Sequence, residues 1–169
     1  MMKRIFAVLM ATMLVLSVGC GKAAKNLSEK IAEKAIEAQS GGDAKVDIKD
    51  GKMTVKTKDG NAVFDAGGNV SIPESFPKDV YIPKGAKILS SISANEGTVL
   101  TMEVDDTLAK VGEKYASEMK SQGWSELSTM NMNGQLMYSY KKDKRTTSMI
   151  ASSNDNKTQV VLSLAQDSN

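Results

Sequence analysis

The residue that most constrains this chain is Cys20, the only cysteine among 169 residues. A single cysteine cannot form an intramolecular disulfide, so the packing of apolar side chains must hold the fold together. Cys20 also ends a distinct N-terminal segment. Lys3 and Arg4 give that segment a positive start, and residues 5–19 carry no charge and end in the small Gly19. This is the three-part layout of a secretory signal. The run is shorter than the roughly 20 apolar residues of a membrane-spanning helix.

The stretch Leu16-Ser17-Val18-Gly19-Cys20 resembles a lipobox, the modification site of bacterial lipoproteins. The resemblance implies that the thiol of Cys20 takes a diacylglycerol group through a thioether and that a signal peptidase cuts between Gly19 and Cys20. Ser17 stands where Leu is usual. The alternative is an ordinary signal peptide followed by a free thiol, a reactive group in an exported chain. We expect residues 1–19 to be removed and residues 20–25 to form a lipidated cysteine with a short tether.

Lipidation would place the protein in the cell envelope, because two or three acyl chains anchor a protein stably where one does not. The membrane is then a partner through the lipid on Cys20. Gly21 rather than Asp follows the cysteine. In a Gram-negative host this resemblance implies sorting to the periplasmic face of the outer membrane.

Charge and composition exclude several functions. Two of the 22 basic residues lie in the signal segment, which leaves 20 basic against 20 acidic residues in the rest of the chain. Net charge therefore gives no support for a nucleic-acid partner. The chain has no histidine, which excludes Ser-His-Asp catalysis and His-ligated metal sites within it. We predict no metal site and no cofactor.

The first folded part is predicted over residues 26–72, as a helix followed by a three-stranded β-meander. Asn26 and Glu29 form a capping-box pattern at the start of a segment rich in helix formers. This helix either packs on the domain or lies against the bilayer surface. Asp50-Gly51 and Asp59-Gly60 are typical hairpin turns between short alternating segments.

Residues 73–85 are predicted to be an extended connector, because this segment and Ile72 before it contain all three prolines of the chain. Residues 86–166 then read as two strands, one helix and three or four antiparallel strands. The helix is expected to start at Asp105-Asp106. The predicted fold class is therefore α+β, with one helix packed across an antiparallel sheet.

A second resemblance lies in the connector, in Phe76-Pro77-Lys78-Asp79-Val80-Tyr81-Ile82-Pro83-Lys84-Gly85-Ala86. With Tyr115 and Gly123-Trp124 downstream, this FPxDVPxPxGA-like segment is similar to a widespread set of bacterial lipoproteins, with Tyr81 in place of the usual Pro. The resemblance covers roughly residues 26–165 and implies a fold and a location but no activity. The helix-on-sheet order is also similar to small domains of an accessory lipoprotein of outer-membrane assembly.

The candidate catalytic patterns have simpler structural explanations. Ser-x-x-Lys occurs at Ser75/Lys78, Ser117/Lys120 and Ser139/Lys142, about as often as chance gives, and without companion motifs. Asp105-Asp106 is a carboxylate pair, but neighbouring acids suit the first turn of a helix. Asn154-Asp155-Asn156 lacks the spaced acids of a calcium loop and indicates a hairpin turn.

Two surface features could contact a partner. Lys141, Lys142, Lys144 and Arg145 form a basic tip between two strands, which is either a solvated turn or a contact for anionic lipid headgroups or an acidic protein. Met130, Met132 and Met137 lie near Trp124, Tyr138 and Tyr140 in sequence. We expect these methionines mostly to fill the core; outward-facing ones would form an adaptable binding surface.

The leading hypothesis is a lipid-anchored, non-catalytic interaction or binding module with an envelope protein or glycan as partner. The first alternative is an accessory lipoprotein of outer-membrane assembly. The second is a small envelope enzyme that uses Ser/Lys or carboxylates.

Overall fold

The computed structural model describes residues 22–39, 44–58, 60–66 and 69–166. The chain divides into two compact units, Met1–Val63 and Phe64–Asn169. The predicted connector, residues 73–85, belongs to the second unit and packs onto its core through Phe76 and Val80. Each unit is described separately below.

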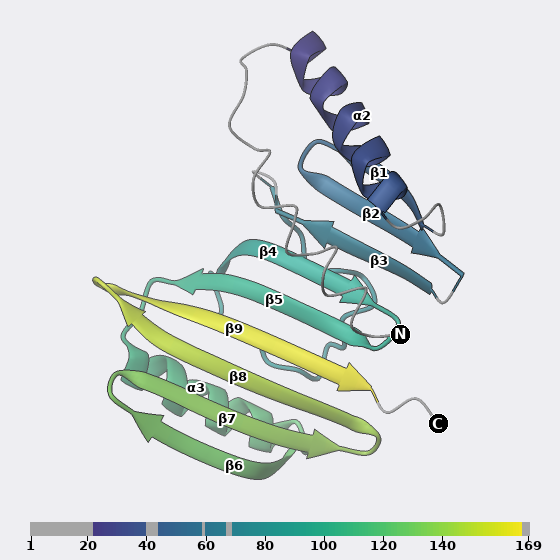
Figure 1. The fold of residues 1–169 in the computed structure, drawn as a ribbon. Helices are drawn as coiled ribbons and strands as arrows, with labels where there is room; N and C mark the ends of the chain where they lie inside the picture. The colour runs from purple at the N-terminus through teal and green to yellow at the C-terminus, as the bar shows by residue number, and fades with distance from the viewer. Residues whose placement is uncertain (1–21, 40–43, 59, 67–68, 167–169) are drawn as a thin grey trace. The chain divides into compact units, whose positions relative to one another are not determined.

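The described residues of the first unit form helix α2 (Lys22–Gln39), strands β1 (Ala44–Lys49) and β2 (Lys52–Thr57) and most of β3 (Gly60–Asp65), in the order β1-β2-β3 (Figure 1). β1 and β2 are antiparallel, with Val46 opposite Val55. Asp50 and Gly51 connect them with φ values of 52° and 85°. Two consecutive positive φ values define the tight hairpin turn that an Asp-Gly pair favours.

Helix α2 begins earlier than the capping pattern predicted. It starts at Lys22 and continues through Asn26, so the predicted N-cap at Asn26 is wrong and residues 22–25 are helical rather than an extended tether. The physical reason is that Lys22-Ala23-Ala24-Lys25 contains only strong helix formers, which outweigh the local preference of Asn for a cap.

Over its described residues, from Lys87 to Gln166, the second unit forms six strands and one helix (Figure 1). The strands are β4 (Lys87–Ala94), β5 (Gly97–Val104), β6 (Ser125–Met132), β7 (Gln135–Lys142), β8 (Arg145–Asn154) and β9 (Lys157–Gln166), and the helix is α3 (Leu108–Ser121). Their order in the sheet is β4-β5-β9-β8-β7-β6, and each neighbouring pair is antiparallel. The α+β class is confirmed. The C-terminal strand β9 lies inside the sheet, and β6 is its last strand beyond β7.

Helix α3 starts one step later than predicted. Thr107, not Asp105 or Asp106, is the N-cap, and its hydroxyl accepts a hydrogen bond from the Lys110 N–H at 3.5 Å. The Asp106 carboxylate accepts from the Thr107 N–H at 2.9 Å. Asp106 is therefore a second hydrogen-bond acceptor at the start of α3. Thr107 occupies the N-cap, a position that threonine favours, so the paired acids precede the helix.

The core lies between α3 and one face of the sheet. In Figure 1, α3 lies behind β7 and β8. Gly112 permits a close approach, because a Cβ atom there would lie 2.5 Å from Leu136 Cδ1 of β7. The buried apolar side chains of this core are Phe76, Val80, Leu100, Met102, Val104, Val111, Tyr115, Met119, Trp124, Leu136, Tyr140, Met149, Ala151, Val160, Leu162 and Leu164.

The opposite face of the same sheet carries an apolar row across four strands. The strand register places Met130 opposite Met137, Met137 opposite Ile150, and Ile150 opposite Val161. On β7, β8 and β9 these residues alternate with buried ones, so they point away from α3, and Met130 lies on the same face because it is opposite Met137. The sheet is therefore apolar on both faces at this position, although α3 covers only one of them.

Candidate functional site

The predicted lipidation and cleavage residues, Cys20 and Gly19, lie outside the described residues, so the structure does not test them. Within the described residues, no helix is both long and apolar enough to cross a membrane. Two other features bear on function. One is the basic tip between β7 and β8, and the other is the exposed hairpin of β6 and β7.

Two of the four cations in the basic tip bind Asp79 of the connector. Arg145 Nη1 and Nη2 donate to the two carboxylate oxygens of Asp79 at 2.7 and 2.8 Å. Lys142 Nζ donates to Asp79 Oδ2 at 2.7 Å and to the Gln122 carbonyl at 2.7 Å. A bidentate arginine–carboxylate pair is among the strongest ionic contacts in proteins. These two cations therefore hold the connector against the β7–β8 turn.

Trp124 completes this cluster. Its indole Nε1 donates to the Asp79 carbonyl at 2.5 Å, and the Arg145 guanidinium lies over its ring at 5.1 Å from the centroid. Arg145, through its hydrogen bonds, holds the pKa of the Asp79 carboxyl far below its usual range, and Lys142 adds to this. The same contact raises the pKa of Arg145. Asp79 is thus a permanent carboxylate at neutral pH.

The four cations of the predicted basic tip differ in exposure and in their ion pairs. Arg145 and Lys142 are half-buried and share the Asp79 carboxylate, which balances one of their two charges, whereas Lys141 and Lys144 are the exposed cations of the tip. Asp79 has this effect because the connector folds back onto the sheet, a contact that spans more than 60 residues of sequence. A shallow depression of about 460 Å³ beside the tip is lined by Gly123, Ser125, Leu127, Lys141, Lys142 and Asp143.

The second feature is an exposed apolar surface, which we call the edge patch. It consists of Leu127, Met130, Met132, Met137 and Ile150, exposed by 57%, 47%, 56%, 37% and 37%. The prediction that the three methionines mostly fill the core is therefore wrong. Their sequence neighbours Trp124 and Tyr140 are buried instead. β6 is the last strand of the sheet. The core lies under α3 and β7, and the side chains of β6 remain exposed.

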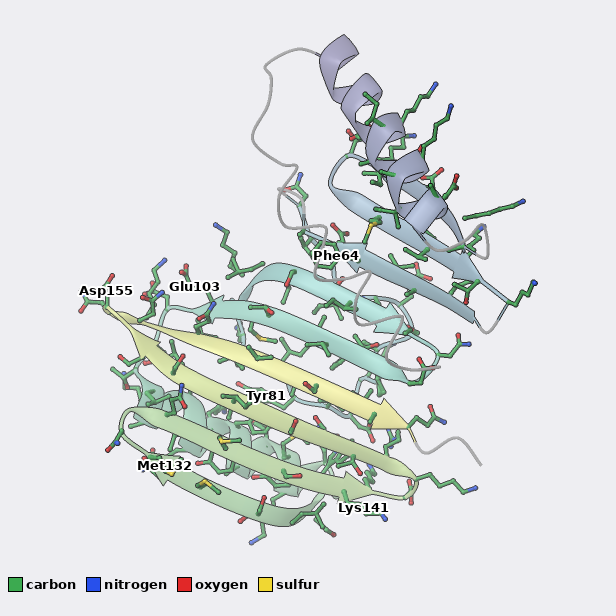
Figure 2. The ribbon with its side chains drawn as sticks, in the orientation of Figure 1. Phe64, Tyr81, Glu103, Met132, Lys141 and Asp155 are labelled. Atoms are coloured by element: carbon green, nitrogen blue, oxygen red, sulfur yellow. The ribbon has the colours of Figure 1, made fainter. Side chains whose placement is uncertain are left out.

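The edge patch follows the hairpin of β6 and β7. Figure 2 shows Met132 at the end near the β6–β7 turn and Lys141 at the opposite end of the hairpin. All eight residues of β6 are exposed. Glu126 is the one charged residue of β6, and its carboxylate accepts a hydrogen bond from the Thr129 hydroxyl at 2.7 Å. The hairpin thus presents thioether and aliphatic groups with little charge, the composition of an adaptable docking surface.

The other candidate residues are not assembled into a catalytic arrangement. Ser75, Lys78, Ser117 and Lys120 are all exposed. Ser139 and Lys142 are separated by an odd number of positions on β7, so they point to opposite faces of the sheet. Asp155 has a φ of 52° in the β8–β9 turn, as a hairpin turn requires. The described residues contain no group of acidic side chains close enough to hold a metal ion.

Sequence reasoning missed two sets of carboxylates. The sequence places Asp79 in the FPxDVPxPxGA-like segment, and its position between Pro77 and Pro83 is the one local signal that it is held rigidly. Glu33 and Glu37 lie in a segment rich in helix formers, with no local signal of a contact to β1. In the structure they accept hydrogen bonds from the backbone of β1, at 2.6 Å from Ile48 N and 2.9 Å from Val46 N.

With this geometry in place, comparisons with known proteins give a partial match. A family model described as START domain-like matches residues 88–166, from β4 to the end of β9. The match covers somewhat less than half of the chain, so it shows a similarity of the second unit to this family and not membership of the chain in it. A comparison with curated proteins found no match.

Among solved structures, the chain is similar to the cyanobacterial PsbP protein (CyanoP) of Synechocystis sp. PCC 6803. The two share 13% identity over 73% of this chain and 78% of that chain, with a TM-score of 0.32. A likeness at this level supports no inference about the function of this chain.

Proposed function

We propose that this chain is a lipid-anchored lipoprotein of the bacterial cell envelope that acts as a non-catalytic docking module. The anchor would be the lipid on Cys20, and the docking surface would be the edge patch on β6, β7 and β8. One observation carries the docking part of the proposal: five large apolar side chains gather on one exposed hairpin and its neighbour. Scattered apolar residues are normal on a protein surface, whereas a contiguous group at a sheet edge is typical of a contact site.

The anchor is tested by mass analysis of the mature N-terminus, with Cys20→Ala as the matched variant. We expect wild-type protein to begin at Cys20 with added acyl mass and to fractionate with membranes. Cys20→Ala should remain unmodified and lose at least most of that membrane association. Wild-type protein without acyl mass at Cys20, or a variant that stays in the membrane fraction, would refute the anchor.

The docking surface is tested by site-specific photocrosslinking in the cell that makes the protein. A photoreactive side chain at Met132 should give one or a few discrete adducts. The same group at Ile72, an exposed apolar residue outside the patch, is the control and should give none. Equal labelling from both positions would show that the edge patch has no special contact role.

The supporting role of Lys141 and Lys144 follows from their position. Both cations are exposed at the end of the hairpin away from the β6–β7 turn: Lys141 lines the shallow depression with Leu127, and Lys144 lies on the adjoining turn. They would contribute attraction for an anionic partner or headgroup, an effect that salt screens. Arg145 and Lys142 contribute little to it, because Asp79 already balances one of their charges and holds both side chains.

A further inference from the structure

The outward backbone groups of β6 and those of β1 differ in their hydrogen-bond partners. β1 is covered by carboxylates of α2, which accept the N–H groups of Val46 and Ile48 that point away from β2. Among the described residues, no strand and no side chain takes the corresponding groups of β6. An unpaired strand edge is a template for another strand.

We propose that β6 pairs antiparallel with β6 of a second copy of this chain, so that two sheets join into one across a two-fold axis. This inference rests on the proposed function, because it names the partner of the edge patch. Antiparallel pairing of a strand with itself is the simplest self-complementary contact that a two-fold axis allows.

The hairpin geometry determines which backbone groups are available. Asn133 and Gly134 have φ values of 41° and 82°, and Met132 is opposite Gln135 across this two-residue turn. The residues that flank such a turn exchange hydrogen bonds with each other, and the pattern repeats at every second residue. Met132 and Met130 therefore direct their N–H and C=O groups to β7, whereas Asn131 and Thr129 direct theirs outward.

One register uses all of these outward groups. With Met130 on the two-fold axis, Thr129 of each copy is opposite Asn131 of the other, and the two pairs form four backbone hydrogen bonds. The two Met130 side chains meet on the sheet face away from α3. The apolar row from Val161 to Met130 then continues into the same row of the second copy.

Charge is compatible with this register. Glu126 is the one charge on β6. It falls opposite the Asn133-Gly134 turn of the second copy, not opposite the other Glu126, so no like charges face each other. Opposed like charges across strands would destabilise the pair. By contrast, β1 carries Lys45, Asp47 and Lys49, which discourage strand addition.

A bilayer is a poorer occupant for this edge than a second strand. Hydrocarbon offers no hydrogen-bond partner for backbone N–H and C=O groups, so unpaired groups are strongly unfavourable there. A second β6 satisfies these groups and covers Met130 and Met132 together. A contact made by one strand pair is at the low end of specific interfaces in area. Anchoring both copies to one membrane would raise their effective concentration and compensate for the small area.

Disulfide crosslinking of the full chain, expressed with its signal segment and oxidised in isolated membranes, tests the register. Met130→Cys should form a disulfide-linked dimer in most molecules, because Cα atoms of directly opposed residues lie about 4.5–5.5 Å apart, within disulfide range. Met137→Cys is the matched control. It is on the same face one strand further in, so the two copies of residue 137 would be about 15 Å apart.

We expect at least a five-fold excess of dimer for Met130→Cys over Met137→Cys. Equal yields, no dimer from either variant, or adducts of Met130→Cys with other proteins only would overturn the pairing. Met130 is about half exposed, so its replacement leaves the core intact.

Wild-type protein in the same experiment distinguishes failure of the pairing proposal from failure of the anchor proposal. If Cys20 has a free thiol, wild-type protein itself forms disulfides through Cys20, which shows that the anchor proposal failed. Cys20→Ala combined with Met130→Cys should still form the Met130-centred dimer at raised protein concentration. Its failure to do so, when the wild type is lipidated, would count against the pairing alone.

Discussion

The strands β1 and β6 show two ways of ending a β-sheet. At β1 the protein supplies its own partners: Glu33 and Glu37 of α2 accept the N–H groups of Ile48 and Val46. At β6 the backbone faces outward beside Leu127, Met130 and Met132. A carboxylate accepts backbone hydrogen bonds as a neighbouring strand would, but it cannot extend the sheet. The contrast teaches that closure of an edge can come from a helix in the same unit, and that its absence at β6 leaves a surface able to pair.

Composition reinforces the difference. The exposed positions of β1 include Lys45 and Asp47, whereas β6 has eight exposed residues and a single charge, Glu126. Charged edges resist strand addition, and a neutral edge with apolar neighbours does not. The two edges therefore differ in both hydrogen bonding and charge, and the predictions below test each part of that contrast.

The largest effect is expected from the contacts of Asp79 with Arg145 and Lys142, which we call the clamp and which hold the connector against the β7–β8 turn. Asp79→Ala leaves Arg145 and Lys142 without their shared carboxylate, so we expect the free energy of unfolding of the second unit to fall by about 2–4 kcal/mol. Urea unfolding followed by Trp124 fluorescence measures it. Lys144→Ala, at an exposed position of the same turn, is the control and should change stability by less than about 0.5 kcal/mol. A loss below 1 kcal/mol for Asp79→Ala would mean that the clamp is not needed to position β7.

The next largest effect on stability is expected at the close contact of α3 with β7. Gly112→Val would place side-chain atoms where Leu136 Cδ1 and the Tyr138 hydroxyl now lie, at 2.5 and 3.1 Å from a Cβ atom. We expect a loss of about 1–3 kcal/mol from overpacking. Lys114→Val, at an exposed position of α3, is the control; it costs only a few tenths of a kcal/mol in helix propensity and loses the exposed ion pair with Glu118. Equal effects of the two variants in thermal unfolding would show that α3 is not tightly seated on the hairpin.

A third prediction concerns the closed edge. Replacing both Glu33 and Glu37 with Ala should uncover the N–H groups of Ile48 and Val46 and destabilise the first unit by about 1–2 kcal/mol. Amide hydrogen exchange at these two residues should accelerate about 5- to 30-fold, a readout specific to the edge. Lys34→Ala on the same helix should leave both exchange rates unchanged. Unchanged rates in the double variant would remove the β1 side of the comparison.

The sequence predicts the features of this fold that depend on interactions between residues close together in the chain. Hairpin turns such as Asp50-Gly51 and Asn133-Gly134 are determined by neighbouring residues, so the sequence identifies them. The α+β class follows from the periodicity of the helix and strands. The start of α2 was predicted wrongly because a capping preference at Asn26 competes with helix formers before it, and only summed propensity decides the outcome.

The candidate site was harder to predict because it depends on contacts far apart in sequence. Alternation places Met130 and Met132 on the same face of β6, but it does not show that β6 is the last strand of the sheet. That position follows from β9 inserting between β5 and β8. Likewise, four clustered cations suggested a basic surface, and only the folded connector shows that Asp79 neutralises part of it. The local sequence identifies the side chains of the site, but their exposure depends on the order of the strands in the sheet.

The smallest effect is a pH dependence of the clamp. Arg145 and Lys142 lower the pKa of Asp79 in the folded protein well below its ordinary value of 3.8, so the unfolded chain binds the proton more readily. The stabilising contribution of the Asp79 charge is therefore complete above about pH 5 and declines as the pH falls below 4 toward the folded-state pKa. Between pH 5 and pH 3, the stability difference between wild type and Asp79→Asn should narrow by about 1 kcal/mol. Glu103 and Asp106, whose pKa values are also lowered by their hydrogen bonds, titrate alike in both proteins and cancel in the difference. A difference that remains constant down to pH 3 would mean that Asp79 holds the hairpin through its shape and neutral hydrogen bonds, not through its charge.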